Sequence, residues 1–114
     1  ALSGVAAITG WAIDNTVAAN LGPIYEMDAY LDGVLIASTN PQISSNLISR
    51  VPRTGGQYNP CTQYPGRSDC SAPGFTFNWN TSPYAGTSQH TLLIDAEGGG
   101  QTWSYTSMSV TVSN

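Results

Sequence analysis

The sequence contains no lysine, and its only cationic side chains besides one histidine are Arg50, Arg53 and Arg67. Charged residues make up only 9% of the 114 residues and the formal net charge is −4, so the chain lacks the basic patch that nucleic-acid binding requires. The same deficit disfavours docking to an anionic membrane. No apolar run approaches the roughly 20 residues that a membrane-spanning helix needs. These absences predict a protein without nucleic-acid partners and without membrane insertion.

Cysteine and histidine are also scarce. The two cysteines, Cys61 and Cys70, lie close together in a segment rich in proline and glycine, and the one histidine, His90, lies in a separate segment. A zinc site needs more ligands than this, and the Cys-x-x-Cys spacing of a redox pair is absent. The pair therefore predicts a disulfide, which is typical of an oxidising, extracytoplasmic compartment. On this ground we expect an extracellular or cell-surface location.

The chain does contain a clear alternation of apolar and polar residues, which is typical of half-buried strands. It predicts strands within 5–14, 24–31, 34–38, 74–79, 91–96 and 101–112, with a further short strand within 42–51. Asp32-Gly33 is a strong signal for a two-residue hairpin. A slip in the alternation between Tyr105 and Met108 predicts a bulge or a bend there. About seven strands and no sustained helical pattern predict one all-β domain over residues 1–114, a two-sheet antiparallel sandwich.

A long irregular connection interrupts this pattern between residues 40 and 73, where compact domains usually have shorter loops. We expect the cysteine pair to close the part around 50–74. This disulfide-closed loop carries cationic, aromatic and acidic side chains suited to binding a ligand: Arg53, Tyr58, Tyr64, Arg67 and Asp69. If the domain recognises a small ligand, this loop is the expected place.

Five segments in the right order resemble the bacterial immunoglobulin-like domains, and together they span nearly the whole chain. They are Gly10-Trp-Ala-Ile-Asp-Asn, Met27-Asp-Ala-Tyr-Leu-Asp-Gly, Phe77-Asn-Trp-Asn-Thr, Tyr84-Ala-Gly and His90-Thr-Leu-Leu-Ile-Asp-Ala. The segment from Gly86 to His90 is two residues longer than the usual Gly-Thr-His pattern. The resemblance implies an immunoglobulin-like sandwich, usually without catalysis, that serves as an accessory module of secreted enzymes and surface proteins. It also implies that Trp11 and Trp79 pack inside.

Two sets of side chains have residue types found in hydrolases. Ser88, His90 and Asp95 are the types of a catalytic triad, but no nucleophile elbow surrounds the serine, so we interpret the histidine as a structural hydrogen-bonding group. Glu26 and Asp28 share one strand face, as a glycosidase pair might, but their alternation with apolar residues is typical of a solvent-facing strand side. We therefore expect no enzymatic activity.

Calcium is the one cofactor that the sequence leaves open, because extracellular sandwiches often bind it through loop oxygens. The candidate ligands are Asp14, Asn15, Asp95 and Glu97, which would have to converge at one end of the sandwich. No Asp-x-Asp-x-Asp run supports such a site.

We expect a structural, spacer or adhesion module whose partners are neighbouring domains or other proteins. The alternative is a carbohydrate-binding module, in which exposed rings such as Tyr58, Tyr64, Trp11 or Trp103 would stack on a polysaccharide. Self-association is a third expectation, because the weakly charged, Thr/Ser-rich strand from Ser104 to Ser113 offers a poorly guarded edge.

Overall fold

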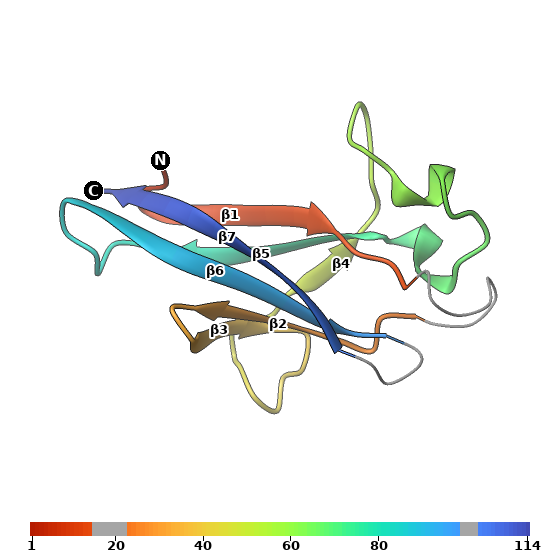
Figure 1. Cartoon of the computed structure of the whole chain (residues 1–114), viewed down its shortest axis with the longest axis horizontal. Helices are drawn as coiled ribbons and strands as arrows, with labels where there is room; N and C mark the ends of the chain where they lie inside the picture. Colours follow the sequence, from red (N-terminus) through yellow and green to blue (C-terminus); the bar gives the residue numbers. More distant parts are fainter. Residues whose placement is uncertain (15–22, 99–102) are drawn as a thin grey trace.

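The computed structural model describes residues 1–14, 23–98 and 103–114, which form two antiparallel sheets packed face to face (Figure 1). The three-stranded sheet has the order β1-β5-β4, with β1 at Val5–Trp11, β5 at Gly74–Asn80 and β4 at Ser49–Val51. The four-stranded sheet has the order β3-β2-β6-β7, with β3 at Val34–Ser38, β2 at Glu26–Leu31, β6 at Thr87–Glu97 and β7 at Trp103–Ser113. This all-β, two-sheet sandwich confirms the expected fold class.

In the described residues, the strand order is one that also occurs in immunoglobulin sandwiches. The sheet β1-β5-β4 follows the order of strands B, E and D, and β3-β2-β6-β7 follows C′, C, F and G. Before β1, Leu2 pairs in parallel with Val112, at the position that strand A occupies in an immunoglobulin sandwich. The free edges of β1 and β7 therefore lie on the side of the sandwich where strand A would run.

The turns and registers follow the sequence pattern in most places. Asp32 and Gly33 have φ of 49° and 84° and join β2 to β3 as the expected two-residue hairpin. The bulge expected between Tyr105 and Met108 is wrong, because β6 and β7 pair without interruption along the whole of β7. The alternation slips there because both faces of β7 are exposed, so burial does not enforce it. The irregularity lies in the β2–β3 pair instead.

Side chains from both sheets fill the space between them. Its buried apolar residues are Met27, Ala29, Leu31, Ala37, Ile48, Phe75, Phe77, Trp79, Leu92, Ile94 and Val112. Trp79, Leu92 and Ile94 are thus in the core as the alternation predicts, and Ala96 packs against it. The ring of Phe75 lies over Gly10, where an added Cβ would approach ring atoms to 2.6 Å. Only glycine fits there without moving the ring.

Trp11 corrects an expectation. Its side chain is 44% exposed, because Ile8, Gly10 and Ala12 take the inward positions of that segment. The indole lies on the outer face of the three-stranded sheet, where its ring centroid is 5.2 Å from that of Tyr58.

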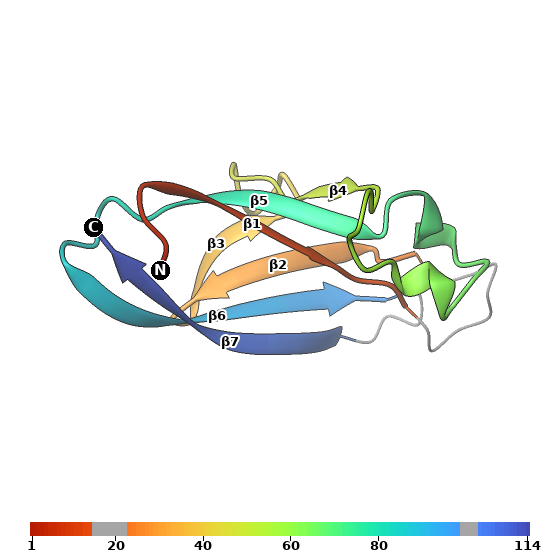
Figure 2. The same ribbon diagram turned by 90° about the horizontal axis from the view of Figure 1, so that it is seen from above.

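The functional candidates lie at opposite ends of an elongated molecule. Both termini lie at one end, and the loop between β4 and β5, with its two short 3-10 helices at Pro60–Thr62 and Ser68–Ser71, lies at the other (Figures 1 and 2). From above, the four-stranded sheet forms one layer and the three-stranded sheet the other (Figure 2).

Candidate functional site

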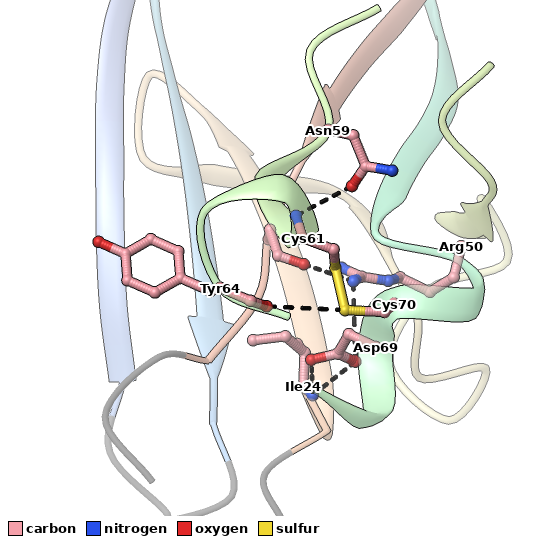
Figure 3. Close-up of a disulfide and its surroundings, with 8 residues drawn as sticks. Ile24, Arg50, Asn59, Cys61, Tyr64, Asp69 and Cys70 are labelled. Carbon is pink, nitrogen blue, oxygen red and sulfur yellow. Dashed lines mark hydrogen bonds and ion pairs between the residues drawn. A yellow bond between two sulfur atoms is a disulfide. The ribbon is translucent and has the colours of Figure 1, made fainter. Parts of the chain in front are cut away.

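The disulfide between Cys61 and Cys70 is present, as the sequence predicts. The first short helix, Pro60–Thr62, begins after Asn59, whose side-chain oxygen accepts a 2.9 Å hydrogen bond from the Cys61 N–H (Figure 3). A proline at the first position fits this start, because proline has no N–H to satisfy. The disulfide thus ties this helix to the second one, in a loop with little apolar surface of its own.

Asp69 joins this loop to the sandwich. Its two carboxylate oxygens accept hydrogen bonds of 3.1 and 3.2 Å from the Ile24 N–H, and the carboxylate lies 3.8 Å from the Arg50 guanidinium (Figure 3). The Asp69 side chain is only 8% exposed. Arg50 in turn donates to the Ala12 carbonyl oxygen, and its burial lowers its pKa. This carboxylate is engaged in holding the loop to β2 and β4.

Arg53 is engaged in a similar way. Its Nε donates a 2.7 Å hydrogen bond to the Tyr58 carbonyl oxygen, and its Nη1 donates a 3.1 Å bond to the Gly10 carbonyl oxygen. The loop is thereby tied to β1 through backbone acceptors. Both hydrogen bonds use nitrogens of the planar guanidinium, so a lysine at this position could not form the same pair of hydrogen bonds.

The other loop residues predicted to bind a ligand are spread over its surface. Tyr58 is half-exposed and its ring contacts Trp11. Tyr64 and Arg67 are partly buried, and the Tyr64 ring points away from the disulfide (Figure 3). The two rings that the structure brings together on this side are therefore Trp11 and Tyr58, at an interplanar angle of 49°.

At the other end of the molecule, three side chains form a hydrogen-bonded chain with the order of a hydrolytic triad. The Ser88 hydroxyl lies 2.8 Å from His90 Nε2, and His90 Nδ1 lies 2.7 Å from the Asp32 carboxylate. In the tautomer that satisfies both contacts, Nδ1–H donates to Asp32 and Nε2 accepts from the serine. Asp32 also accepts a 2.8 Å bond from the Thr91 N–H. The hydrogen bond from His90 and the one from Thr91 lower the pKa of Asp32.

The carboxylate that hydrogen-bonds to His90 in this series is that of Asp32 and not that of Asp95. Ser88 and His90 share the inward face of β6 with Leu92, whereas Asp95 has the opposite parity and lies on the outer face. The pairing of Leu31 with Leu92 brings the β2–β3 turn, and hence Asp32, beside His90. The sequence pattern alone did not reveal this contact, because it depends on the register between β2 and β6.

The surroundings of His90 are those of a packed side chain. The ring is 9% exposed and lies in edge contacts with Tyr84 and Trp79, at centroid distances of 4.5 and 6.0 Å. Ser88 is two residues away on the same strand. The hydrogen-bonded chain thus joins β6, the β2–β3 turn and the aromatic cluster at one end of the core.

Carboxylates gather on the outer face of the four-stranded sheet. Glu26 pairs with Glu97 across β2 and β6, and Asp28 pairs with Asp95. Asp28 is not solvent-facing as expected, because it is buried and accepts a hydrogen bond from the Ser38 hydroxyl. The side-chain hydrogen bond with Asp28 and partial burial raise the pKa of Glu26. Burial, together with the charge of Asp28, raises the pKa of Asp95.

The calcium candidates are only partly brought together. Asp14 is buried beside Gly98, Asp95 and Glu97 lie on β6, and Asn15 lies outside the described residues. Across residues 1–14, 23–98 and 103–114, no group of three or more His, Cys, Asp or Glu side chains is placed to hold a metal ion.

A hollow of about 640 Å³ opens between β1 and β7. Its lining includes Gly10, Phe75, Ile94, Thr106 and Met108. A second hollow of about 410 Å³ continues along the same two strands toward the termini. Sequence reasoning pointed to the edge of β7 but missed the hollow, because the gap depends on how far β1 and β7 diverge.

Comparisons of the chain with protein-family models, with curated proteins and with solved structures found no match. In the parts of the chain that the structure describes, no helix has the length and hydropathy needed to cross a bilayer. The fold class and the disulfide are therefore what is established, and the function is inferred from the geometry.

Proposed function

We propose that this chain is a non-catalytic, immunoglobulin-like module of a larger bacterial surface or secreted protein, with a structural, spacer or adhesion role. The observation that carries the proposal is that side chains capable of chemistry are engaged in bonds that hold the sandwich together. Asp69 and Arg53 tie the disulfide-closed loop to the sheets, and His90 ties β6 to the β2–β3 turn. The disulfide supports an oxidising, extracellular location.

The hydrogen-bonded series Ser88–His90–Asp32 has a structural role in this proposal, and we refer to it as the clasp. A catalytic serine needs an accessible hydroxyl and donors arranged for an oxyanion, whereas this one lies beside a packed histidine ring. The clasp should therefore affect stability and not catalysis. Replacing Ser88 by alanine removes one partly buried hydrogen bond and is expected to lower the free energy of unfolding by about 1 kcal/mol.

Labelling with a fluorophosphonate probe, followed by mass spectrometry, tests the absence of catalysis. The proposal predicts no labelled Ser88, and equal rates of p-nitrophenyl acetate hydrolysis for the wild type and Ser88→Ala. Hydrolysis that disappears in Ser88→Ala and in His90→Gln, with both variants still folded by circular dichroism, would overturn the proposal and identify a hydrolase.

Carbohydrate binding is the second candidate, and one observation favours it. Trp11 and Tyr58 form an exposed aromatic pair beside the disulfide-closed loop, and Trp103 and Tyr105 are exposed on β7. Aromatic rings of this kind stack on sugar rings, although the 49° angle between Trp11 and Tyr58 gives no flat platform. Titration with a panel of soluble polysaccharides, followed by tryptophan fluorescence, tests it: a change that Trp11→Ala abolishes supports binding, and no change at millimolar sugar removes the candidate.

A further inference from the structure

We propose that β7 pairs with β7 of a second copy of this chain, so that the two four-stranded sheets join into one continuous sheet across a two-fold axis at Thr106. This inference goes beyond the proposed function, because it names a partner and a contact that no role as spacer or adhesin requires. It rests on the backbone edge, the side-chain pattern and the charge of β7.

Over most of its length, the outer edge of β7 forms no backbone hydrogen bond with another described strand. Leu2 donates its N–H to the Thr111 carbonyl oxygen and accepts from the Ser113 N–H, both at 2.8 Å, so the odd-numbered residues of β7 point their N–H and C=O groups away from β6. The β6–β7 register is uninterrupted, so the same holds for Trp103, Tyr105, Ser107 and Ser109. Their part of the edge lies beyond Leu2 and is not bonded to any described strand.

The described residues leave most of β7 exposed on this side of the sandwich. The inward-facing residues change from fully buried at Val112, through partly buried at Val110, to 45% exposed at Met108. Thr106 and Ser104 continue this face and are exposed as well. All seven residues from 103 to 109 are exposed, those that point to the inner face as well as those that point to the outer face. They nevertheless lie in a regular strand beside an apolar hollow. A strand added beyond β7 would cover the exposed edge of β7 and the apolar hollow beside it.

The edge has none of the features by which proteins prevent such pairing. Residues 103–113 contain no charged residue and no proline, and the strand has no bulge against β6. Long, regular, uncharged edges of this kind tend to add a further strand. β7 itself carries none of the net charge of −4, and the nearest carboxylates, Asp95 and Glu97, lie on the neighbouring strand β6.

The side chains of β7 fit a second copy in the opposite direction. The unpaired stretch is centred on Thr106, so antiparallel pairing about this residue places Trp103 opposite Ser109 of the partner subunit and Tyr105 opposite Ser107 of the partner subunit. On the inward face it places Ser104 opposite Met108 of the partner subunit. Each large side chain thus meets a small one, which is the arrangement that lets cross-strand neighbours pack. The inward-facing Met108 of the partner subunit then covers the hollow.

A disulfide-trapping experiment tests this register directly. The native cysteines are already paired, so one new cysteine is the only free thiol. Thr106 faces its own copy in a non-hydrogen-bonded pair, with Cα atoms about 4.5 Å apart, which is within the range for a disulfide. Ser104 is equally exposed on the same face, but it would lie about 13 Å from its own copy. Thr106→Cys should therefore form a covalent dimer under mild oxidation at least tenfold faster than Ser104→Cys.

Sedimentation equilibrium on the unmodified chain tests the association itself. The wild type is expected to dimerise with increasing concentration, and Ser107→Pro to weaken dimerisation at least tenfold, because it removes an outward N–H that β6 does not use. Ser107→Ala, which keeps that N–H, should dimerise like the wild type. A wild type that stays monomeric at about 1 mM, or equal crosslinking of Thr106→Cys and Ser104→Cys, would overturn the proposal. If Ser107→Pro fails to fold, the comparison of Thr106→Cys with Ser104→Cys still tests the proposed pairing of β7.

Discussion

The two lateral sides of this sandwich differ in how the sheets are joined. On the side of β3 and β4, the segment 39–48 crosses from one sheet to the other. Ser38 donates to the Asn46 carbonyl oxygen and accepts from the Ile48 N–H, and the Asn46 side chain donates to Ile36 in one sheet and Asn78 in the other. Ile48, at 5% exposure, fills the space between them. We refer to this as the closed side.

On the side of β1 and β7, the sheets are joined only at one end in the described residues. Leu2 pairs with the end of β7, and the Gly4 carbonyl oxygen accepts from Thr81, after which β1 and β7 diverge toward the disulfide-closed loop (Figure 1). This is the open side. Each side has a single parallel bridge, between Leu2 and Val112 on the open side and between Ser38 and Leu47 on the closed side. Among the described residues, the open side therefore lacks a segment that fills the gap between the sheets as 39–48 does on the closed side.

The largest difference should appear when one apolar side chain is removed from each side. Ile48→Ala leaves a cavity in the core and is expected to lower the free energy of unfolding by about 3 kcal/mol. Met108→Ala removes a side chain that is 45% exposed and should lower it by less than about 1 kcal/mol in the monomer. Urea unfolding at low protein concentration measures both values, and equal losses would contradict the distinction between the sides.

A smaller loss is expected from the hydrogen bonds of the closed side. Asn46→Ala removes the donor that joins the Ile36 and Asn78 carbonyl oxygens and should lower the free energy of unfolding by about 1–2 kcal/mol. The neighbouring Ser45→Ala, at an exposed position, provides the control. If the two variants are equally stable by thermal unfolding, Asn46 does not hold the sheets together.

The smallest effect concerns the charge of Glu26, which accepts a 3.0 Å hydrogen bond from Asn40 on the closed side. Its pKa is raised above the ordinary value of 4.5, so the folded state binds this proton more tightly than the unfolded state does. Stability is therefore lost as the pH rises from about 4.5 through the folded-state pKa. Glu26→Gln keeps the acceptor and removes the charge.

This substitution should raise the free energy of unfolding at pH 7 by well under about 1 kcal/mol, because the side chain is largely solvated. Below about pH 4 it should have no effect, since the wild-type carboxyl is then protonated in both states. Denaturant titrations at the two pH values measure the difference. A loss of stability at pH 7 would mean that the negative charge itself holds Asn40.

Local features of the fold were predictable from the sequence because they depend on neighbouring residues. Alternation alone placed Trp79, Leu92 and Ile94 in the core, and Asp32-Gly33 specified its hairpin. Spacing and composition were enough for the Cys61–Cys70 disulfide. In each case the physical requirement, a buried face, a positive φ or a nearby thiol, acts within a few residues.

The remaining features depend on contacts between distant segments. Asp32 meets His90 only because of the register between β2 and β6, whereas Asp95, which the sequence suggested as the acid, lies on the opposite face of β6. Asp69 is far in sequence from Ile24, and its carboxylate accepts a hydrogen bond from the Ile24 N–H. The exposure of Trp11 follows from Gly10 and Ala12 taking the inward positions, although the family resemblance implied a packed indole. No local pattern encodes the divergence of β1 from β7 that makes the open side.

Amide hydrogen exchange by NMR, at low and at high protein concentration, tests the open side most directly. The amides of Ser38 and Ile48 on the closed side should be protected at both concentrations, because they are hydrogen-bonded within the chain. Those of Tyr105, Ser107 and Ser109 should exchange rapidly in dilute protein and become protected as the concentration rises. Exchange of these three amides that does not change with concentration would contradict the pairing of β7 with a second copy.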